Sequence, residues 1–379
     1  MIIGVYIIML IDEITYLDKI FEFERKKEIS EQINITNISH WNPSQMYKGY
    51  IEKYIQLDNQ QDIFDYTYTY DLTKNRRLQI MKKLGVQNPM DSMCLLNPSG
   101  TNTILNVINF LKMHNYYKVG ILMPSYFSVE QSCQLCNLPY EKIALQYIEN
   151  KFVIPIEYIL EKKFDAIWLT SPAYSTGISY DDAQINHIKE LMSKNILIIA
   201  DESLALPNQM LLSKIPINDY FFCICTPHKT LFINKIKFSA LICSKKNDDF
   251  LEQWIDILSG SLSSSNLIAI QHFLSDNFIE CFDAAYHWFK KSMGMINDVL
   301  QQFPDAQCNL SEISPYKTIY LKSTKRDLKS LKNINILINN DYTSFIPVSF
   351  NKYTGFRINL SLAPQDIYDA VYRILKYYT

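Results

Sequence analysis

From Met93 to Cys243 the sequence alternates between short apolar runs and longer stretches with a helical pattern. Near-continuous apolar strands separated by helices are typical of a mostly parallel sheet covered by helices on both faces. The predicted strands are Cys94–Asn97, Lys118–Met123, Ala166–Thr170, Ile196–Asp201, Phe221–Cys225 and Phe238–Cys243. The helices between them include Thr101–His114, Ser128–Cys136 and Asp181–Ser193. The predicted fold class is therefore α/β, with this region as a large domain.

After Ser244 the pattern changes, and a small α+β domain is predicted at the C-terminus. Long helices are expected first, over Asp248–Leu258 and roughly Ser265–Gln302. Short strands then alternate with helices, over Thr318–Lys322, Ile334–Ile338, Phe345–Val348 and Arg357–Leu362, before a last helix, Pro364–Tyr378. A chain of 379 residues is long enough for such a division. The expected parts are 1–45, an N-terminal arm with part of the small domain; 46–275, the large domain; and 276–379, the C-terminal small domain.

Charge and composition favour a small-molecule partner. The net charge of -2 gives no electrostatic reason to expect nucleic acid or an anionic membrane as a partner. The apolar run Met1–Leu10 is about half of the ~20 residues that a membrane span needs, so it is interpreted as a docking strand or arm, and a cytoplasmic location is expected. Cysteines in apolar runs, such as Cys223 and Cys225, are interpreted as core thiols. Cys133 and Cys136 have CxxC spacing without a second ligand pair, so no metal site is predicted.

A reactive lysine is predicted after the run Phe221–Cys225. Open α/β sheets bind ligands at the carboxyl ends of their strands, and Thr226 and Lys229 follow this strand directly. Lys237 is a second cation eight residues further on. Burial or a nearby cation lowers the pKa of a lysine and makes it a Schiff-base nucleophile. The alternative is that both are surface lysines in a turn.

Other strand ends carry a phosphate site, an acid and aromatic rings. The turn Asn97–Asn102 opens a helix with small residues and hydroxyls, which suits a phosphate, although an ordinary N-cap would look the same. Asp201 ends a buried strand, where its carboxylate needs a cation such as a protonated heterocyclic nitrogen. Tyr126 and Tyr174 follow two further strands.

Taken in order, these motifs resemble those of the fold-type I pyridoxal-phosphate enzymes, in the class I/II aminotransferase family, over roughly residues 30–379. The resemblance implies a transferase-like fold of this type, with 46–275 binding pyridoxal 5'-phosphate. It implies that Lys229 forms the Schiff base with the cofactor, that Asp201 keeps the pyridine nitrogen protonated, and that Tyr126 stacks on the ring. The residues implied at the phosphate are Ser99, Gly100, Thr101, Thr226, Lys237 in place of an arginine, and, from the partner subunit, Tyr66 with Tyr68 and Tyr70 as register alternatives.

The resemblance also implies a substrate site. Arg357, in the segment Gly355–Ser361, matches the arginine that binds the substrate α-carboxylate, a task suited to a bidentate guanidinium. The loop with His40 and Trp41 is either a packed corner or the wall of a pocket, and it is included among the predicted substrate contacts.

The sequence departs from the family pattern around the cofactor's 3-oxygen. Tyr174 stands where the family has an asparagine, and Leu204 where it has a tyrosine, so both usual donors to this oxygen are replaced. Tyr174 could supply one phenol in compensation. His228, before the lysine, is similar to the His-Lys pair of pyridoxal-phosphate decarboxylases and desulfurases.

Three functions are weighed. The first is an aminotransferase acting on an amino acid, with a 2-oxo acid as acceptor, as a homodimer with shared sites. The second is a decarboxylase, lyase or oxidase of a specialised amino acid with the same cofactor. The third is a non-catalytic pyridoxal-phosphate-binding protein, against which the retained Lys229 and Asp201 argue.

Overall fold

A computed structural model describes residues 13–379, apart from 31–32, 56–73, 149–150, 248–250, 252–253, 256, 259–261, 323–333 and 351–352. The chain divides into two compact units. The large unit comprises Ile51–Tyr174 and Ile178–Ala285, and the small unit comprises the residues up to Tyr50, Ser175–Gly177 and Tyr286–Thr379. Tyr66, Tyr68 and Tyr70 and the apolar N-terminal arm lie outside the described residues.

The large unit contains a seven-stranded sheet in the order β2-β10-β9-β8-β7-β3-β4. Its strands are β2 (Ser92–Asn97), β3 (Val119–Met123), β4 (Tyr140–Ala144), β7 (Ala166–Thr170), β8 (Leu197–Asp201), β9 (Phe221–Cys225) and β10 (Ser239–Ser244). Strand β10 runs antiparallel to β2 and β9, and the other pairs of neighbouring strands are parallel. The prediction of a mostly parallel α/β sheet is confirmed, and each of the six predicted strands is present with its ends within two residues. Strand β4 was missed because, as a partly exposed edge strand with charged residues, it has no apolar run.

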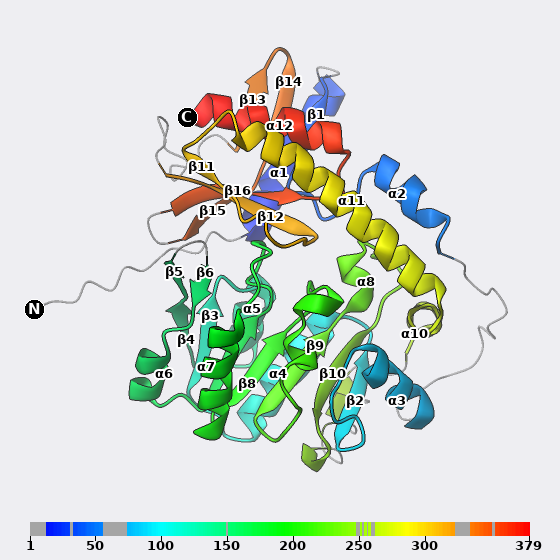
Figure 1. Ribbon diagram of the computed structural model, residues 1–379, viewed down its shortest axis with the longest axis vertical. Coiled ribbons are helices and arrows are strands. Elements are labelled where there is room, and N and C mark those ends of the chain that lie inside the picture. The colour runs from blue at the N-terminus through cyan, green and yellow to red at the C-terminus, as the bar shows by residue number, and fades with distance from the viewer. Residues whose placement is uncertain are drawn as a thin grey trace, which may run out of the picture. The chain divides into compact units, whose positions relative to one another are not determined.

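Helices cover the sheet on both faces, as expected. In Figure 1, α7 (Asp182–Ser193) lies in front of the strands and α4 (Gly100–Met113) behind them. Ser99 and Asp181 begin these two helices by accepting hydrogen bonds from the backbone N–H groups of Asn102 and Gln184. The unit also contains α3 (Lys74–Lys83), α5 (Phe127–Leu135), α6 (Ile156–Lys162), α8 (Pro227–Thr230), α10 (Ser264–Leu274), the hairpin β5 (Gln146–Ile148) and β6 (Lys151–Val153), and short 3-10 turns at Pro207–Gln209, Leu211–Ser213 and Lys245–Asn247.

One predicted helix is wrong in its extent. The expected helix from Ser265 to Gln302 is two helices, α10 and α11 (Asn277–Leu300). The break is at Ser275, whose backbone is extended, with ψ 164°, and whose hydroxyl donates to the carbonyl of His272. Such a side-chain bond to the previous turn competes with continuation of the helix. The predicted helix Asp248–Leu258 lies partly outside the described residues.

The small unit is built on an antiparallel sheet in the order β11-β12-β16-β15. Its strands are β11 (Ala306–Gln307), β12 (Tyr316–Leu321), β15 (Pro347–Phe350) and β16 (Tyr353–Asn359). A second sheet joins β1 (Ile35–Asn37), β13 (Asn335–Ile338) and β14 (Asp341–Ser344), and the helices are α1 (Glu13–Ser30), α2 (Gln45–Glu52) and α12 (Pro364–Tyr378). Gly355 allows β16 to approach β12, because a Cβ there would lie 1.9 Å from the carbonyl oxygen of Ile319. The predicted α+β character is confirmed.

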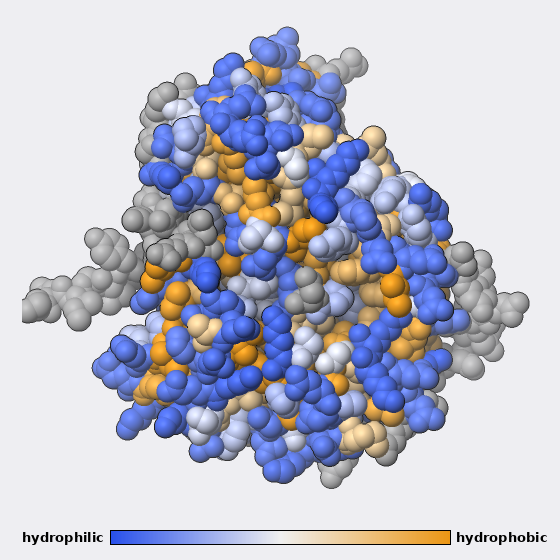
Figure 2. Space-filling model, viewed as in Figure 1, coloured by the Kyte–Doolittle hydropathy of each residue, from blue (hydrophilic) through white to orange (hydrophobic). Residues whose placement is uncertain are grey.

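The apolar residues of the sheet strands are buried in the core of the large unit. The face seen in Figure 2 carries mainly hydrophilic residues, with hydrophobic ones in small groups. Among the residues that the structure describes, no helix is long and apolar enough to cross a membrane.

Candidate functional site

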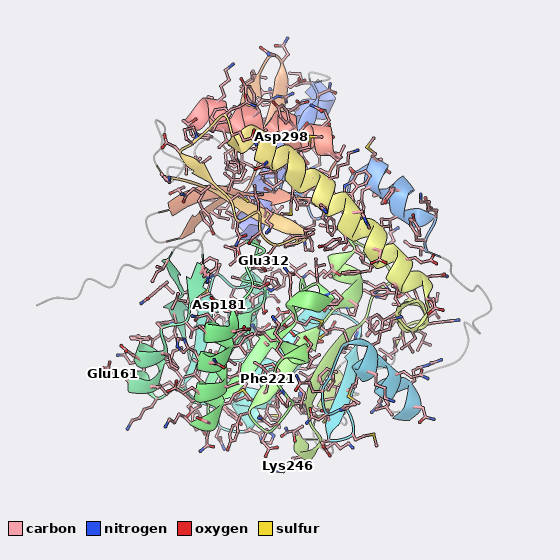
Figure 3. The ribbon with its side chains drawn as sticks, viewed as in Figure 1. Glu161, Asp181, Phe221, Lys246, Asp298 and Glu312 are labelled. Carbon is pink, nitrogen blue, oxygen red and sulfur yellow. The ribbon has the colours of Figure 1, made fainter. Side chains whose placement is uncertain are left out.

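The lysine that was predicted to be reactive lies at the carboxyl end of the parallel strands. Phe221, labelled in Figure 3, begins β9 at one end of the sheet, and Lys229 lies on α8, directly after the other end. The Lys229 Nζ atom lies 4.5 Å from the ring centroid of Tyr126. Burial lowers the pKa of Lys229 below its ordinary value, Lys237 lowers it further, and Asp201 opposes both. Lys229 is therefore a weaker base than an ordinary lysine and gives up its proton more readily.

The carboxylate of Asp201 is held by a residue that sequence reasoning missed. Asp201 is the last residue of β8 and is only 3% exposed. Its Oδ1 atom accepts hydrogen bonds from the backbone N–H of Ser203, at 3.1 Å, and from the Ser203 hydroxyl, at 2.6 Å. A hydroxyl two residues after the strand-end acid was the available signal, because such side chains commonly form a local turn.

Hydroxyl groups gather at the N-terminus of α4, where the phosphate site was predicted. The Thr226 hydroxyl lies 3.1 Å from that of Ser203 and 3.3 Å from that of Ser239. A Cβ atom on Gly100 would lie 3.1 Å from the Thr226 hydroxyl, so glycine allows this hydroxyl to approach the first turn of α4 closely. Ser99 is the N-cap of α4, which agrees with the alternative interpretation of this turn as an ordinary helix cap. An N-cap does not exclude the predicted anion site, because a helix N-terminus also presents N–H groups and the positive end of its dipole.

A pair of histidines fixes the turn that carries the lysine. His228 is fully buried, and its Nε2 atom lies 3.1 Å from Nδ1 of His272 on α10. Burial and, to a smaller extent, the neighbouring His272 lower the pKa of His228 to about 3. Burial and Lys83 also lower the pKa of His272, against an opposing hydrogen bond with the Tyr54 backbone. His272 was missed because 44 residues separate the two histidines in the chain.

In the small unit, Arg357 is buried between two aromatic rings. It is 1% exposed, and its guanidinium carbon lies 4.5 Å from the ring centroid of Trp41 and 5.1 Å from that of Tyr316. Nη2 donates to the carbonyl of Ser39 at 2.7 Å, and Nη1 to the hydroxyl of Ser175 at 3.5 Å. Burial lowers the pKa of Arg357 to about 9, so the side chain is still charged at neutral pH.

The loop with His40 and Trp41 has the contacts of a packed corner. His40 Nδ1 accepts a hydrogen bond from the backbone N–H of Asn42, and burial lowers the pKa of this histidine. Asn359 donates to the carbonyls of both His40 and Asn42. Arg357 and Asn359 therefore share the strand face that holds this loop, as the alternation along β16 predicts. A role for His40 and Trp41 in substrate binding stays a prediction.

Comparison with known proteins places this geometry in a known fold. No family model matches the sequence, and no curated protein matches it. Among solved structures, a double mutant of Thermus thermophilus aspartate aminotransferase is similar at TM-score 0.72 and 11% identity, over 97% of this chain and 96% of that one. Aspartate aminotransferase from Thermotoga maritima is similar at TM-score 0.72 and 16% identity, over 95% and 96%.

The chain has the fold of pyridoxal-phosphate-dependent aminotransferases. A pyridoxal-phosphate-bound C-S lyase from Staphylococcus hominis also has this fold, at TM-score 0.67 and 13% identity, over 90% of this chain and 87% of that one. The predicted fold class is thus confirmed.

Tyr174 and Leu204, the two residues that depart from the expected sequence pattern, are both buried. Tyr174 is 8% exposed, and its ring centroid lies 5.6 Å from that of Tyr126. Leu204 is also 8% exposed. Burial raises the pKa of Tyr126, and Asp201 raises it further, against an opposing hydrogen bond with the Thr101 side chain. Lys237 is partly buried, and its carbonyl accepts a hydrogen bond from Asn266.

Proposed function

We propose that the protein is a pyridoxal-phosphate-dependent aminotransferase that transfers an amino group from an amino acid to a 2-oxo acid. One observation carries the proposal: Lys229, an amine with a lowered pKa, lies over the ring of Tyr126, and the charge of Asp201 acts on that pKa. An amine, an aromatic face and a buried carboxylate at one sheet edge are the groups this chemistry requires.

The residues present fit the cofactor. When bound, pyridoxal phosphate supplies an aldehyde that captures amines and a conjugated ring that withdraws electrons from the substrate. The hydroxyl of Thr226 and the backbone N–H groups at the first turn of α4, which begins at Gly100, suit the phosphate. Ser99, Thr101, Lys237 and Tyr66 are proposed to join them.

Asp201, Tyr126 and Lys229 have separate tasks in this proposal. The carboxylate of Asp201, fixed by Ser203, would hold a protonated ring nitrogen. The ring of Tyr126 would lie flat against the cofactor. Lys229 would carry the cofactor covalently and, once displaced by substrate, move a proton as general acid and base, for which its lowered pKa is suited. Arg357 is proposed to bind the substrate carboxylate.

A half-reaction tests the proposal directly. Purified protein loaded with pyridoxal phosphate is mixed with a panel of amino acids, without an acceptor, and its absorbance is followed. Conversion of the cofactor to its pyridoxamine form, reversed by a 2-oxo acid, is expected. A protein that binds the cofactor but never makes this conversion is not an aminotransferase.

A decarboxylase, lyase or oxidase with the same cofactor is the second candidate. Buried Tyr174 and Leu204 stand in place of both usual donors to the cofactor's 3-oxygen, and this favours altered chemistry at the ring. Release of carbon dioxide, ammonia or peroxide without an acceptor would support it, whereas a strict requirement for a 2-oxo acid would rule it out.

We also propose a cytoplasmic homodimer with shared sites, on the family resemblance and an isologous interface. Light scattering coupled to gel filtration tests the assembly. A monomer that keeps full activity at micromolar concentration contradicts it.

A further inference from the structure

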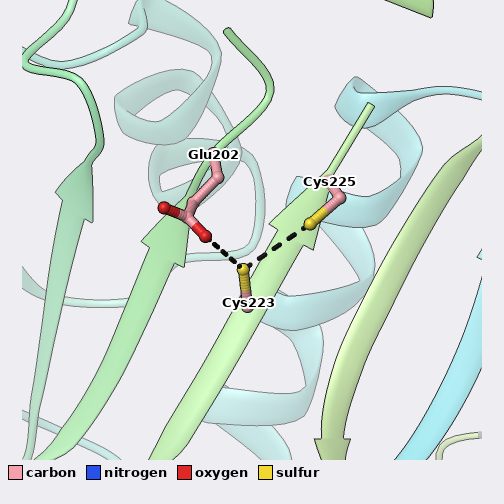
Figure 4. A group of neighbouring side chains, drawn as sticks. All are labelled: Glu202, Cys223 and Cys225. Atoms are coloured by element: carbon pink, nitrogen blue, oxygen red, sulfur yellow. Dashed lines mark hydrogen bonds between the residues drawn. The ribbon is translucent and has the colours of Figure 1, made fainter. Parts of the chain in front are cut away.

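Three side chains that the proposed reaction does not use meet on one face of the sheet. Cys223 and Cys225 are two residues apart on β9, so their thiols point to the same face. Glu202 directly follows β8, and its backbone N–H donates to the carbonyl of Ile224 at 2.8 Å, which brings its side chain beside the thiols. Figure 4 shows the three groups turned toward one another. All three are buried.

Their spacing matches the edges of a tetrahedral metal site. The two sulfur atoms are 3.7 Å apart, and Cys223 Sγ lies 3.1 Å from Glu202 Oε2. All the ligand atoms lie within 4.8 Å of one another. With Zn–S distances of about 2.3 Å and Zn–O of about 2.0 Å, a tetrahedral ion requires S···S separations of about 3.8 Å and S···O of about 3.5 Å. The two edges that Cys223 makes are therefore within a few tenths of an ångström of these values, and the Cys225 thiol and the Glu202 carboxylate, within 4.8 Å of each other, would draw together around the ion.

A cavity beside the cluster gives a second, independent reason to expect a ligand. It has a volume of about 330 Å³ and is lined by Glu202 and Cys225, together with Lys83, Met210 and Phe273. It offers an entry path and room for a fourth ligand such as water. Lys83 also lines this cavity and places a positive charge on its wall.

Backbone N–H groups also fix the orientation of the Glu202 carboxylate. Glu202 Oε1 accepts a hydrogen bond from the backbone N–H of Leu211 at 2.5 Å, and Oε2 from that of Leu212 at 3.0 Å. Backbone donors that fix a ligand in this way are common around metal sites, where they tune both orientation and affinity.

We propose that Glu202, Cys223 and Cys225 bind one thiophilic divalent metal ion of the Zn²⁺ class, with the fourth position open to the cavity. Binding releases two protons, one from each thiol, to solvent through the cavity. The ion replaces the Cys223 proton that now bridges to Glu202 Oε2. The complex of ion, two thiolates and carboxylate carries a net charge of -1. The site would tie β8 to β9 through side chains that the proposed reaction does not use.

The test uses the full chain, stripped of metal and kept reduced, and titrated with Cd²⁺ as probe. One equivalent is expected to bind with an ultraviolet thiolate-to-cadmium band, and Zn²⁺ is expected to compete for the site and raise the melting temperature. Cys223→Ser combined with Cys225→Ser should abolish the band, and Glu202→Gln should weaken binding at least tenfold. The matched control changes the other cysteine pair, Cys133→Ser with Cys136→Ser, and should leave the band intact.

Wild-type protein provides a measurement that does not depend on a variant folding. X-ray absorption at the zinc edge of the 1:1 complex should find two sulfur ligands and an oxygen. A shell of nitrogen and oxygen alone, a band lost only in the control pair, or a Cys223–Cys225 disulfide in the protein as isolated would each overturn the proposal.

Discussion

Lys229 and Arg357, the two cations on which the proposed function depends, are held in opposite ways. Lys229 is partly exposed and lies over one aromatic ring, with a carboxylate and a second cation acting on its pKa. Arg357 is almost fully buried between two rings, and its guanidinium donates to a carbonyl and a hydroxyl. The lysine has a lowered pKa and gives up its proton more readily than an ordinary lysine, whereas the arginine, with a pKa of about 9, remains charged at neutral pH. Each environment suits its proposed task, proton transfer for one and fixed anion binding for the other.

The largest effect is expected from replacement of Lys229. Lys229→Ala should lose covalent attachment of the cofactor and at least the ~10²–10⁴-fold contribution of a positioned acid and base. Borohydride reduction followed by peptide mass mapping measures the attachment, and single-turnover kinetics measures the rate. Lys235→Ala, which changes an exposed lysine of the same loop, is the matched control. A reducible adduct that persists in Lys229→Ala but disappears in Lys235→Ala would move the attachment to Lys235.

Arg357→Ala tests the other side. Loss of one partner of a buried charge pair costs about 2–5 kcal/mol, which corresponds to a fall in kcat/KM of roughly 30- to 5,000-fold. The absorbance of the bound cofactor should stay unchanged, because Lys229 and its neighbours belong to the other unit. Arg357→Lys keeps a charge without the planar fork and should recover only part of the activity. A fall in kcat/KM of less than threefold with Ala would mean that Arg357 does not bind the carboxylate.

Sequence reasoning succeeded where a group follows directly from a strand end. Asp201, Thr226 and Lys229 could be placed because parallel strands bring their carboxyl ends to one edge. It failed where the partner comes from a distant segment. His272 and Ser239 could not be assigned to the site, because pairing of α10 with α8 and of β10 with β9 is set by tertiary packing.

One of two neighbouring acids could be identified from the sequence, and the other could not. Asp201 was identified from the need of a buried carboxylate for a partner. The partners of Glu202 are the Cys223 thiol on the next strand and the backbone N–H groups of Leu211 and Leu212, and none of these has a spacing signal in the sequence. Chain alternation at the end of β8 gives these adjacent carboxylates separate surroundings.

The pH dependence of stability tests the buried state of His228, the residue directly before Lys229. His228 has a pKa of about 3 in the folded chain, against about 6.5 when unfolded. Between these values the unfolded state binds more protons, so stability falls as the pH falls, by up to about 1.4 kcal/mol per pH unit. Protonation of this group in the unfolded state should therefore lower the free energy of unfolding, measured with urea, by about 2 kcal/mol at pH 5. His228→Asn should flatten that slope, whereas His287→Asn, at an exposed position on α11, should not. An unchanged slope in His228→Asn would mean that the pair does not titrate as described.

The smallest effect concerns Trp41, whose ring lies 4.5 Å from the guanidinium carbon of Arg357. If the indole serves to hold the arginine, Trp41→Phe should lower the free energy of unfolding by about 0.5–1 kcal/mol, because phenylalanine binds a cation more weakly through its ring. KM for the substrate should change little. A double-mutant cycle with Arg357→Lys measures the coupling directly, and about 0.5 kcal/mol or more is expected for residues in contact. No coupling, together with a tenfold rise in KM for Trp41→Phe, would instead make Trp41 the wall of the substrate pocket, with the arginine held by Ser39 and Tyr316.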